Sequence, residues 1–164
     1  MKSSLKLILF LFVTFTAVGC DRVTKNLAKA HLAHQEPVSY FNDVFRLEYA
    51  ENIGAAMSLG ADWPENTRFW LLRLFPLALL LLLLAYTVQQ AGQLHQGQVV
   101  SLALIFSGGA GNLVDRLFYD SRVPDFMILR VQSLHTGIFN VADVCISAGV
   151  AMMLGFALFA KKQD

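Results

Sequence analysis

Four long apolar stretches are the feature that most restricts the fold of this 164-residue chain. They cover about residues 5–25, 69–88, 99–117 and 138–160. A helix needs roughly 20 apolar residues to cross a bilayer core, where its backbone groups must bond within the segment. Hydrophobic residues make up 55% of the chain and charged residues 15%, whereas soluble domains average about 45–50% and about 25%. The pattern predicts an α-helical integral membrane protein with four transmembrane helices.

The number of spans and the positions of the basic residues predict an orientation. Four spans place both termini on one side, and residues 1–164 then form a single membrane domain. Cytoplasmic ends of spans are enriched in Lys and Arg, so both termini are expected in the cytoplasm. The two long loops, residues 31–66 and 118–137, are then extracytoplasmic. The basic residues that support this orientation are Lys2, Lys6, Lys161 and Lys162.

One part of the first long loop has the pattern of a β-strand. Within residues 44–50, aromatic or aliphatic side chains alternate with charged ones. This period of two is typical of a strand with one buried face. We therefore expect a small extracytoplasmic β-containing subdomain with short strands within residues 31–66.

The first apolar stretch has two interpretations. Basic residues, an apolar run and the sequence before Cys20 resemble a lipoprotein signal peptide, which would make Cys20 a lipidated N-terminus. Helix-compatible sequence follows Cys20, however, with Asp21 and Lys25 spaced for an i,i+4 ion pair. We favour a retained helix, in which Asp21 and Lys25 have a structural role.

Two acids stand out because of their position relative to the last span. Asp143 is the fifth residue of Phe139-Asn140-Val141-Ala142-Asp143, inside the apolar stretch, and Asp125 lies just outside that stretch. An ionised carboxylate at membrane depth is costly and indicates a functional site. An acid in the first turn of a helix also stabilises the helix dipole, and Pro124-Asp125 is common in turns. The pair together predicts acid–base chemistry at a bilayer surface.

Amide and guanidinium side chains accompany these acids. Asn112 and Arg116 are four residues apart and share one helix face, and Asn140 lies one turn before Asp143. Asp115 and Arg116 are equally consistent with an ion-pair network that anchors the helix end. Asn52 and Gly54 fit either a turn or a loop whose amide contacts an extended substrate.

Several classes of function have no support in the sequence. The net charge is +1 and no basic run is present, so no nucleic-acid partner is expected. The four histidines lack the spacing of metal ligands, and neither a metal nor another cofactor is expected. Cys20 and Cys145 lie in or beside apolar segments, where a disulfide is not expected.

Five short motifs, in this order and with this spacing, resemble the lipoprotein signal peptidase family (signal peptidase II), which are membrane aspartic proteases. Each motif is weak alone, but together they cover nearly the whole chain. Met57 departs from the aromatic residue often found after the second motif, and Ser107 replaces a glycine. The motifs are Asp21-Arg22-Val23-Thr24-Lys25, Glu51-Asn52-Ile53-Gly54-Ala55-Ala56, Gly111-Asn112-Leu113-Val114-Asp115-Arg116, Val123-Pro124-Asp125-Phe126 and Phe139-Asn140-Val141-Ala142-Asp143.

The resemblance implies that Asp125 and Asp143 form a catalytic dyad. It also implies a substrate, a diacylglyceryl-modified prolipoprotein that is cut just before its lipidated cysteine at the outer face of the bacterial inner membrane. The enzyme is expected to act as a monomer within the phospholipid bilayer. Substrate-binding or supporting roles are implied for Asn52, Gly54, Asn112, Arg116 and Asn140, and structural roles for Asp21 and Asp115.

A small membrane transporter or proton-relay component is the alternative function, because intramembrane acids also mark ion paths. A transporter predicts acids spread through the depth of several helices. In this chain the acids gather near one end of the spans. This distribution favours the peptidase.

Overall fold

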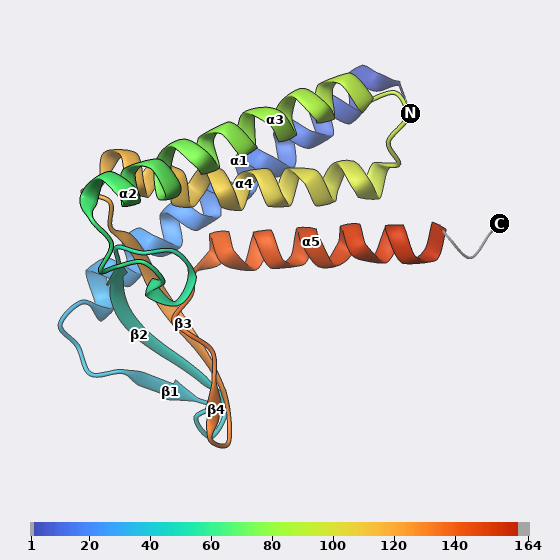
Figure 1. Cartoon of the computed structure of the whole chain (residues 1–164). Coiled ribbons are helices and arrows are strands. Elements are labelled where there is room, and N and C mark those ends of the chain that lie inside the picture. The colour runs from blue at the N-terminus through green and yellow to red at the C-terminus, as the bar shows by residue number, and fades with distance from the viewer. Residues whose placement is uncertain (1, 161–164) are drawn as a thin grey trace.

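The computed structural model describes residues 2–160 and contains four membrane-length helices and a small antiparallel sheet (Figure 1). The predicted fold class is therefore confirmed. Lys161 and Lys162, used above for orientation, lie outside the described residues. The elements are α1 (Ser3–Leu32), β1 (Val38–Tyr40), β2 (Phe45–Asn52), η1 (Ala56–Ser58), α2 (Glu65–Phe69), η2 (Trp70–Leu74), α3 (Phe75–Gln90), α4 (Gln96–Phe118), β3 (Val123–Val131), β4 (Leu134–His135) and α5 (Val141–Ala160).

The helices that are long and apolar enough to span a membrane are Ser3–Leu32, Glu65–Gln90, Gln96–Phe118 and Val141–Leu158. All four differ by some residues from the apolar stretches, and two of these differences have a clear physical cause. α1 continues to Leu32, because its polar final third packs against other elements through buried Asp21 and Lys25. α5 begins at Val141 and not at residue 138, because Phe139 pairs with Met127 of β3 and extends the backbone there.

The second span is one continuous helix built from α2, a single π-helical turn (η2) and α3. Pro76 explains the irregular turn. Proline has no N–H for the carbonyl four residues earlier and its ring clashes with that carbonyl. A π-helical turn just before Pro76 rearranges the local hydrogen bonds, and the Phe75 N–H bonds to the Trp70 carbonyl.

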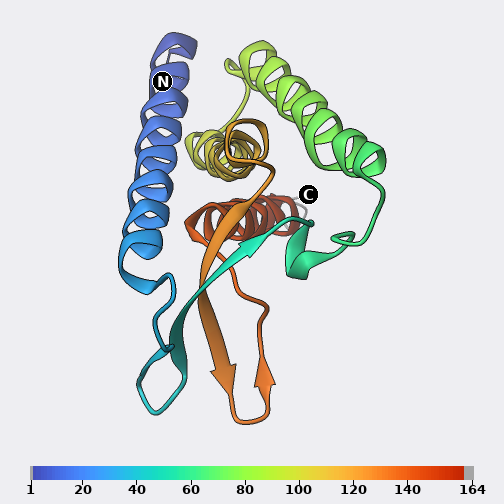
Figure 2. The same cartoon turned by 90° about the vertical axis from the view of Figure 1, so that its left-hand side faces the viewer.

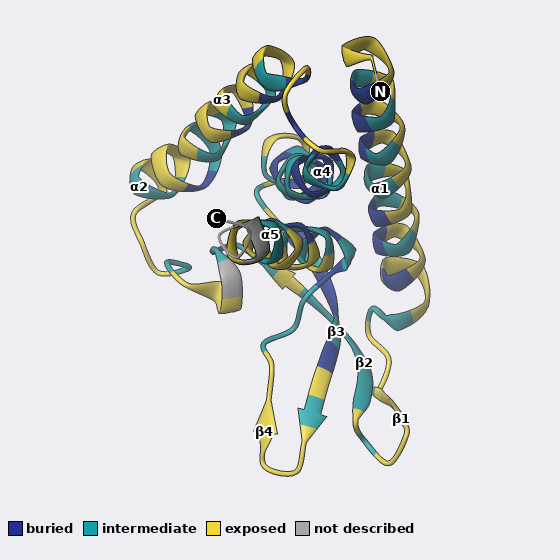
Figure 3. Ribbon diagram, turned by 90° about the vertical axis from the view of Figure 1, so that its right-hand side faces the viewer, coloured by how far each residue is buried: buried dark blue, intermediate teal, exposed yellow. Residues whose placement is uncertain are grey.

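α4 is the central helix of the bundle. Half of the residues in the most apolar part of α4 are buried, compared with 11–17% in the corresponding parts of the other three spans. Figure 3 shows α4 surrounded by α1, α3 and α5. Small residues allow this close approach. A Cβ on Gly111 would lie 2.7 Å from Asp21 Oδ2, and one on Gly149 of α5 would lie 2.6 Å from the Ser101 carbonyl oxygen. Packing of this kind, not water exclusion, drives helix association in a bilayer.

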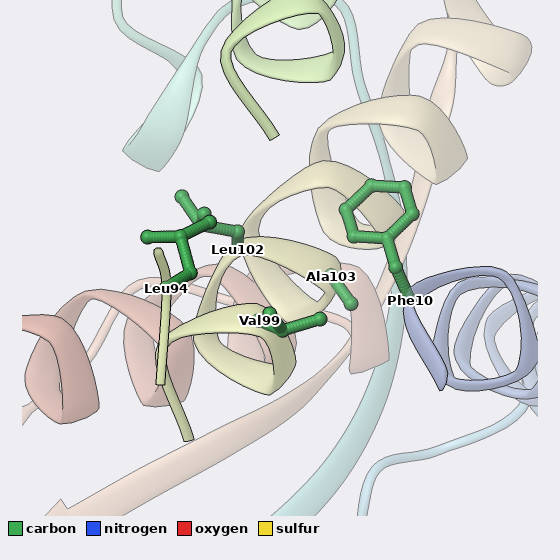
Figure 4. Packing of buried hydrophobic residues seen from close by; sticks show 5 residues of the cluster. All are labelled: Phe10, Leu94, Val99, Leu102 and Ala103. Atoms are coloured by element: carbon green, nitrogen blue, oxygen red, sulfur yellow. The ribbon is translucent and has the colours of Figure 1, made fainter. Parts of the chain in front are cut away.

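The end of the bundle that carries both termini has its own apolar cluster (Figure 4). Lys6 lies beside the cluster and donates hydrogen bonds from Nζ to the carbonyls of Gly92 (3.0 Å) and Leu94 (2.7 Å). These bonds join α1 to the α3–α4 connection. The cluster consists of Phe10, Leu94, Val99, Leu102 and Ala103.

The sheet lies at the opposite end of the bundle. Figures 1 and 2 show its strands extending away from the helices there. Its order is β1-β2-β3-β4, all antiparallel. β2 covers most of the strand expected at residues 44–50. Its register with β3 shifts between Leu47 and Ala50, and Ala50 then pairs with Asp125.

β3 is the longest strand, yet its sequence did not indicate a strand within residues 118–137. Pro124 and Asp125 are residue types that strands disfavour. Pro124 pairs with Glu51 on one side, and β4 pairs only with the far end of β3, at Arg130 and Val131. Proline is therefore tolerated at this position, because no described strand pairs with β3 on the side opposite β2 there and no backbone hydrogen bond is needed on that side.

We expect Gly111→Ala to lower the stability of the bundle. Its methyl group would overlap Asp21 Oδ2 and press on Ala142 of α5, and overpacking of this kind costs about 1–3 kcal/mol. The measurement is the thermal unfolding midpoint of the purified protein in detergent micelles.

Gly155→Ala is the matched control for this change, because no atom lies within 4 Å of a Cβ at that position. Alanine is the better helix former, so the midpoint of this variant should be unchanged or slightly raised. Equal midpoints for the two variants would contradict the close approach of α1, α4 and α5.

Candidate active site

Just before α5, the chain forms backbone hydrogen bonds with β3. This contact brings Asp125 and Asp143 together. The Phe139 N–H donates to the Met127 carbonyl (2.9 Å), and the Phe139 carbonyl accepts from the N–H groups of Phe126 (3.0 Å) and Met127 (2.9 Å). Asn140 follows at once and α5 begins at the next residue. The first turn of α5 is thus held beside Asp125.

Asp125 is a buried carboxyl group with two amide donors. It is only 3% exposed. Its Oδ1 accepts from Asn140 Nδ2 (2.6 Å) and its Oδ2 from Asn52 Nδ2 (3.1 Å). Burial raises the pKa of Asp125 from 3.8 to about 6; the amide bonds oppose this increase and the nearby charge of Asp143 adds to it. The carboxyl group can therefore hold a proton near neutral pH.

Asp143 lies in the first turn of α5 and serves as a helix-capping residue as well as a cavity residue. Its Oδ2 accepts from the Asn140 backbone N–H (3.0 Å), and its own N–H donates to Asn140 Oδ1 (3.1 Å). This reciprocal pair is a capping box. The interpretation of Asp143 as a helix N-terminal acid is thus correct in part. Its Oδ1 accepts from Asn112 Nδ2 (2.9 Å) on α4.

Both acids line one cavity of about 640 Å³ between the sheet, α4 and α5. The size lies within the range of small-molecule and peptide pockets. The remaining wall is mostly apolar and includes Ile138, Phe139, Val144 and Ile146. The polar side chains of the wall are Asn52, Asn112, Arg116, Asp125, Thr136, Asn140, Asp143 and Ser147.

Arg116 lines this cavity and bonds to Gly54, which is not itself a lining residue. Arg116 donates from Nη2 to the Gly54 carbonyl (2.9 Å) and from Nη1 to the Asn112 carbonyl (3.4 Å). The Gly54 N–H donates to Asn52 Oδ1 (2.8 Å), and a Cβ on Gly54 would lie 2.6 Å from the Leu59 carbonyl oxygen. Asn52 also donates to the Ala55 carbonyl (2.9 Å). The turn expected at Asn52 and Gly54 is present, and it places the Asn52 amide on Asp125.

Asp21, Lys25 and Asp115 form a buried ion cluster behind the cavity. Lys25 Nζ lies 2.7 Å from Asp21 Oδ2 and 2.6 Å from Asp115 Oδ2, and it donates to Asn112 Oδ1 (3.0 Å). Asp21 Oδ1 accepts from the Ala142 N–H of α5 (2.9 Å). The cluster therefore holds α1, α4 and α5 together next to Asp143.

Of the two interpretations of Asp115 and Arg116, the ion pair between them is wrong. Asp115 points toward α1, where Arg22 Nη2 contacts its Oδ1 at 2.7 Å, and Arg116 points into the cavity. Adjacent residues on an α-helix point about 100° apart, which puts these two on different faces. Arg22 was not identified from the sequence. The signal was its position in the same motif as Asp21 and Lys25.

Within the described residues, no group of three or more His, Cys, Asp or Glu side chains is placed to hold a metal ion. The chemistry available in the cavity is that of two carboxyl groups, three amides, two hydroxyl groups and one guanidinium. Two close carboxyl groups in a poorly hydrated site share a proton. This arrangement can take a proton from water while donating another to a carbonyl oxygen.

The chain is similar to known proteins along most of its length. A model of the family described as Signal peptidase (SPase) II matches residues 13–159. A lipoprotein signal peptidase of Sulfurihydrogenibium sp. (strain YO3AOP1) is 34% identical over 158 residues, which cover 96% of each chain. One from Sphingopyxis alaskensis is 35% identical over 152 residues, with 88% of this chain and 83% of that protein covered.

The fold also resembles that of a bacterial membrane enzyme solved by the in meso method at 1.9 Å resolution. The TM-score is 0.73 at 22% sequence identity, with 94% of this chain and 92% of that chain covered.

We expect Lys25→Met to destabilise the protein strongly. The change leaves the carboxylates of Asp21 and Asp115 buried without the cation that lies between them, and loss of one member of a buried ion pair costs about 3–5 kcal/mol. Lys29→Met is the matched control on the same helix. Lys29 is 66% exposed and lies 3.8 Å from Glu51, so it should cost less than about 1 kcal/mol. Equal unfolding midpoints for the two variants in detergent would show that the buried cluster does not stabilise the bundle.

Proposed function

The chain belongs to the signal peptidase II family of aspartic peptidases, and we propose that Asp125 and Asp143 are its catalytic pair. The observation that carries this proposal is the shared cavity: Asn140 bonds to both acids, and both face the same space. Asn112 bonds to Asp143 and Asn52 bonds to Asp125. Each carboxyl group is thereby held in a fixed orientation.

The different surroundings of the two acids give them different roles. Asp125 is buried and its raised pKa favours the protonated form. Asp143 is the ionised partner and takes a proton from a water molecule, whose oxygen attacks the scissile carbonyl carbon. Asp125 donates its proton to the carbonyl oxygen, which stabilises the charge that develops there.

Collapse of the tetrahedral diol completes the reaction. The C–N bond breaks, the leaving nitrogen takes the proton held by Asp143, and one diol hydroxyl returns a proton to Asp125. Both acids are then restored to their starting states, and neither a covalent intermediate nor a metal is required. Arg116 and Gly54 would position the substrate backbone beside the cavity, where their hydrogen bond fixes the loop.

We propose that the substrate is a diacylglyceryl-modified prolipoprotein, cut just before the modified cysteine. Relatives of this chain carry the name lipoprotein signal peptidase. The apolar wall of the cavity, formed by residues such as Val144 and Ile146, suits a lipidated substrate. The residues that line the cavity include members of β2, β3 and the neighbouring parts of α4 and α5, and Figure 1 shows the sheet at the end of the bundle opposite the start of α1. With cytoplasmic termini, the site is at the outer surface of the inner membrane, and the enzyme acts as a monomer.

A transporter or proton relay is less well supported. The acids in the described spans are Glu65, Asp21, Asp115 and Asp143, and all lie toward the sheet end. None lies deeper in the described spans, so the described helices provide no chain of acids across the membrane.

Asp125→Asn and Asp143→Asn should each reduce cleavage of a diacylglyceryl prolipoprotein by at least about 10²-fold, because either change removes one proton-transfer group. The assay is peptide cleavage by purified, folded protein in lipid-containing micelles. Asp115→Asn is the comparison, since Asp115 contacts Lys25 and Arg22 but does not line the cavity. It should retain activity per folded molecule. Substantial turnover by either dyad variant would rule out the pair.

The pH profile should show the titration of Asp125. Its pKa is raised to about 6, so the proton needed for the carbonyl oxygen is present below this pH and is lost as the pH rises through it. We therefore expect kcat/KM to fall on the alkaline side with an apparent pKa near this value. A kcat/KM that stays constant from about pH 5 to about pH 8 would contradict the role of Asp125 as the proton donor.

A further inference from the structure

A second cavity lies beside the catalytic one, and Arg116 lines both. Its volume is about 580 Å³, which is large enough for a small ligand or a lipid headgroup. It lies between the start of the second span and the end of α4. Its polar lining residues are Glu65, Asn66, Arg68, Arg73, Arg116, Asp120 and Ser121.

The position of this cavity along the helices corresponds to the headgroup region of a bilayer. It is bordered by the first turns of the span Glu65–Gln90 and by residues directly after the end of α4. Trp70 (57% exposed) and Tyr119 (52% exposed) lie on these same two segments. Exposed Trp and Tyr side chains concentrate at membrane–water interfaces. A ligand here would be in reach of lipid headgroups.

The three arginines of this cavity form no short ion pair within residues 2–160, although Glu65 and Asp120 line the same cavity and Arg116 is near the charges of Asp125 and Asp143. Among the described residues, no carboxylate lies within 4 Å of the guanidinium of Arg68, Arg73 or Arg116. Arg22 and Arg122, by contrast, each form such an ion pair. Nε of Arg68 and Nε of Arg116 are also buried without a hydrogen-bond acceptor. Unsatisfied buried donors are costly, and an anionic ligand in the cavity would offset the positive charge of the guanidinium groups that carry them.

The π-helical turn in the second span explains why two of these arginines line the same cavity. Arg68 and Arg73 are five residues apart, which in a regular α-helix places side chains about 140° apart. The wider turn Trp70–Leu74 lies between them, and both line the cavity. Arg73 is held in place by a hydrogen bond to Ser121 Oγ and by the Phe69 ring, whose centroid is 5.7 Å from its Cζ.

We propose that this cavity binds the phosphate group of an anionic phospholipid headgroup. Planar guanidinium groups match phosphate oxygens with paired hydrogen bonds, and two of these arginines have Nε donors without acceptors. Ile53, Phe69 and Leu72 supply an apolar wall, which suits an amphiphile more than a free ion. The lipid would supply a counterion to Arg68 and Arg73 next to the catalytic cavity.

The test measures lipid retention and not cleavage, so that it is independent of the proposed dyad. Full-length protein carrying Asp143→Asn is purified in detergent, offered equal amounts of phosphatidylglycerol and phosphatidylcholine, and analysed by native mass spectrometry. We expect retention of phosphatidylglycerol to exceed that of phosphatidylcholine by at least about tenfold. The double change Arg68→Gln/Arg73→Gln should remove this preference.

Arg122→Gln/Arg130→Gln is the matched control. It removes the same charge from the sheet end of the molecule, at residues paired with Glu51 and Asp43 outside the cavity. The control should keep the preference. Equal retention of the two lipids by the protein with native arginines, or equal loss in both double variants, would overturn the proposal.

Two further measurements separate the possible sources of phosphate and guard against misfolding. Glycerol phosphate in solution is added as a competitor; binding as tight as that of the lipid would overturn the assignment to a phospholipid. If the Arg68→Gln/Arg73→Gln protein does not fold, the salt dependence of the protein with native arginines decides. The preference should fall as ionic strength rises from about 0.05 to about 0.5 M, and a preference insensitive to salt would overturn the proposal.

Discussion

The side chain of Asn112 makes hydrogen bonds on both sides of the central helix α4, and the arrangement of the site depends on them. Its Oδ1 accepts from Lys25 Nζ (3.0 Å) and from Asn140 Nδ2 (3.2 Å), and its Nδ2 donates to Asp143 Oδ1 (2.9 Å). The ammonium group of Lys25 can only donate, which fixes which end of the amide faces it. A single buried amide thus connects the structural ion cluster to the cavity in which the catalytic pair is proposed.

The sheet, and not the helices alone, determines where the two acids lie. β2 supplies Asn52 and β3 supplies Asp125, and the bridge between Met127 and Phe139 ends just before the first turn of α5. The Asn140–Asp143 capping box then fixes the direction of both side chains. The same four-residue segment, residues 140–143, both caps α5 and, through Asn140, contacts the two acids proposed as the catalytic pair. This dual use explains why an acid is tolerated at the beginning of a membrane-spanning helix.

Local patterns predicted the parts of the fold that depend on local physics. The four spans follow from the length of the apolar stretches, and β2 follows from the alternation around Phe45 and Leu47. β3 was not predicted, because Pro124 and Asp125 are acceptable only in the pairing that the tertiary structure provides. The start of α5 at Val141 likewise depends on a contact with distant Met127.

The candidate site was predicted by residue identity more fully than by geometry. Asn52, Asn112, Arg116 and Asn140 all line the cavity with the two acids. The direction of Asp115 could not be derived from sequence, because it depends on which neighbour covers each face of α4. Arg22 and Lys25 of α1 cover that face. Spacing along one helix showed which residues share a face, but not what that face contacts.

The coupling between Asp125 and Asp143 can be measured directly by infrared titration of the carboxyl groups in isotope-labelled protein. We expect a carboxyl titration near pH 6 that is absent in Asp125→Asn. Because the charge of Asp143 contributes to the raised pKa of Asp125, Asp143→Asn should move this titration to lower pH. An unchanged titration in Asp143→Asn would contradict the claim that the two acids face one another and share a proton.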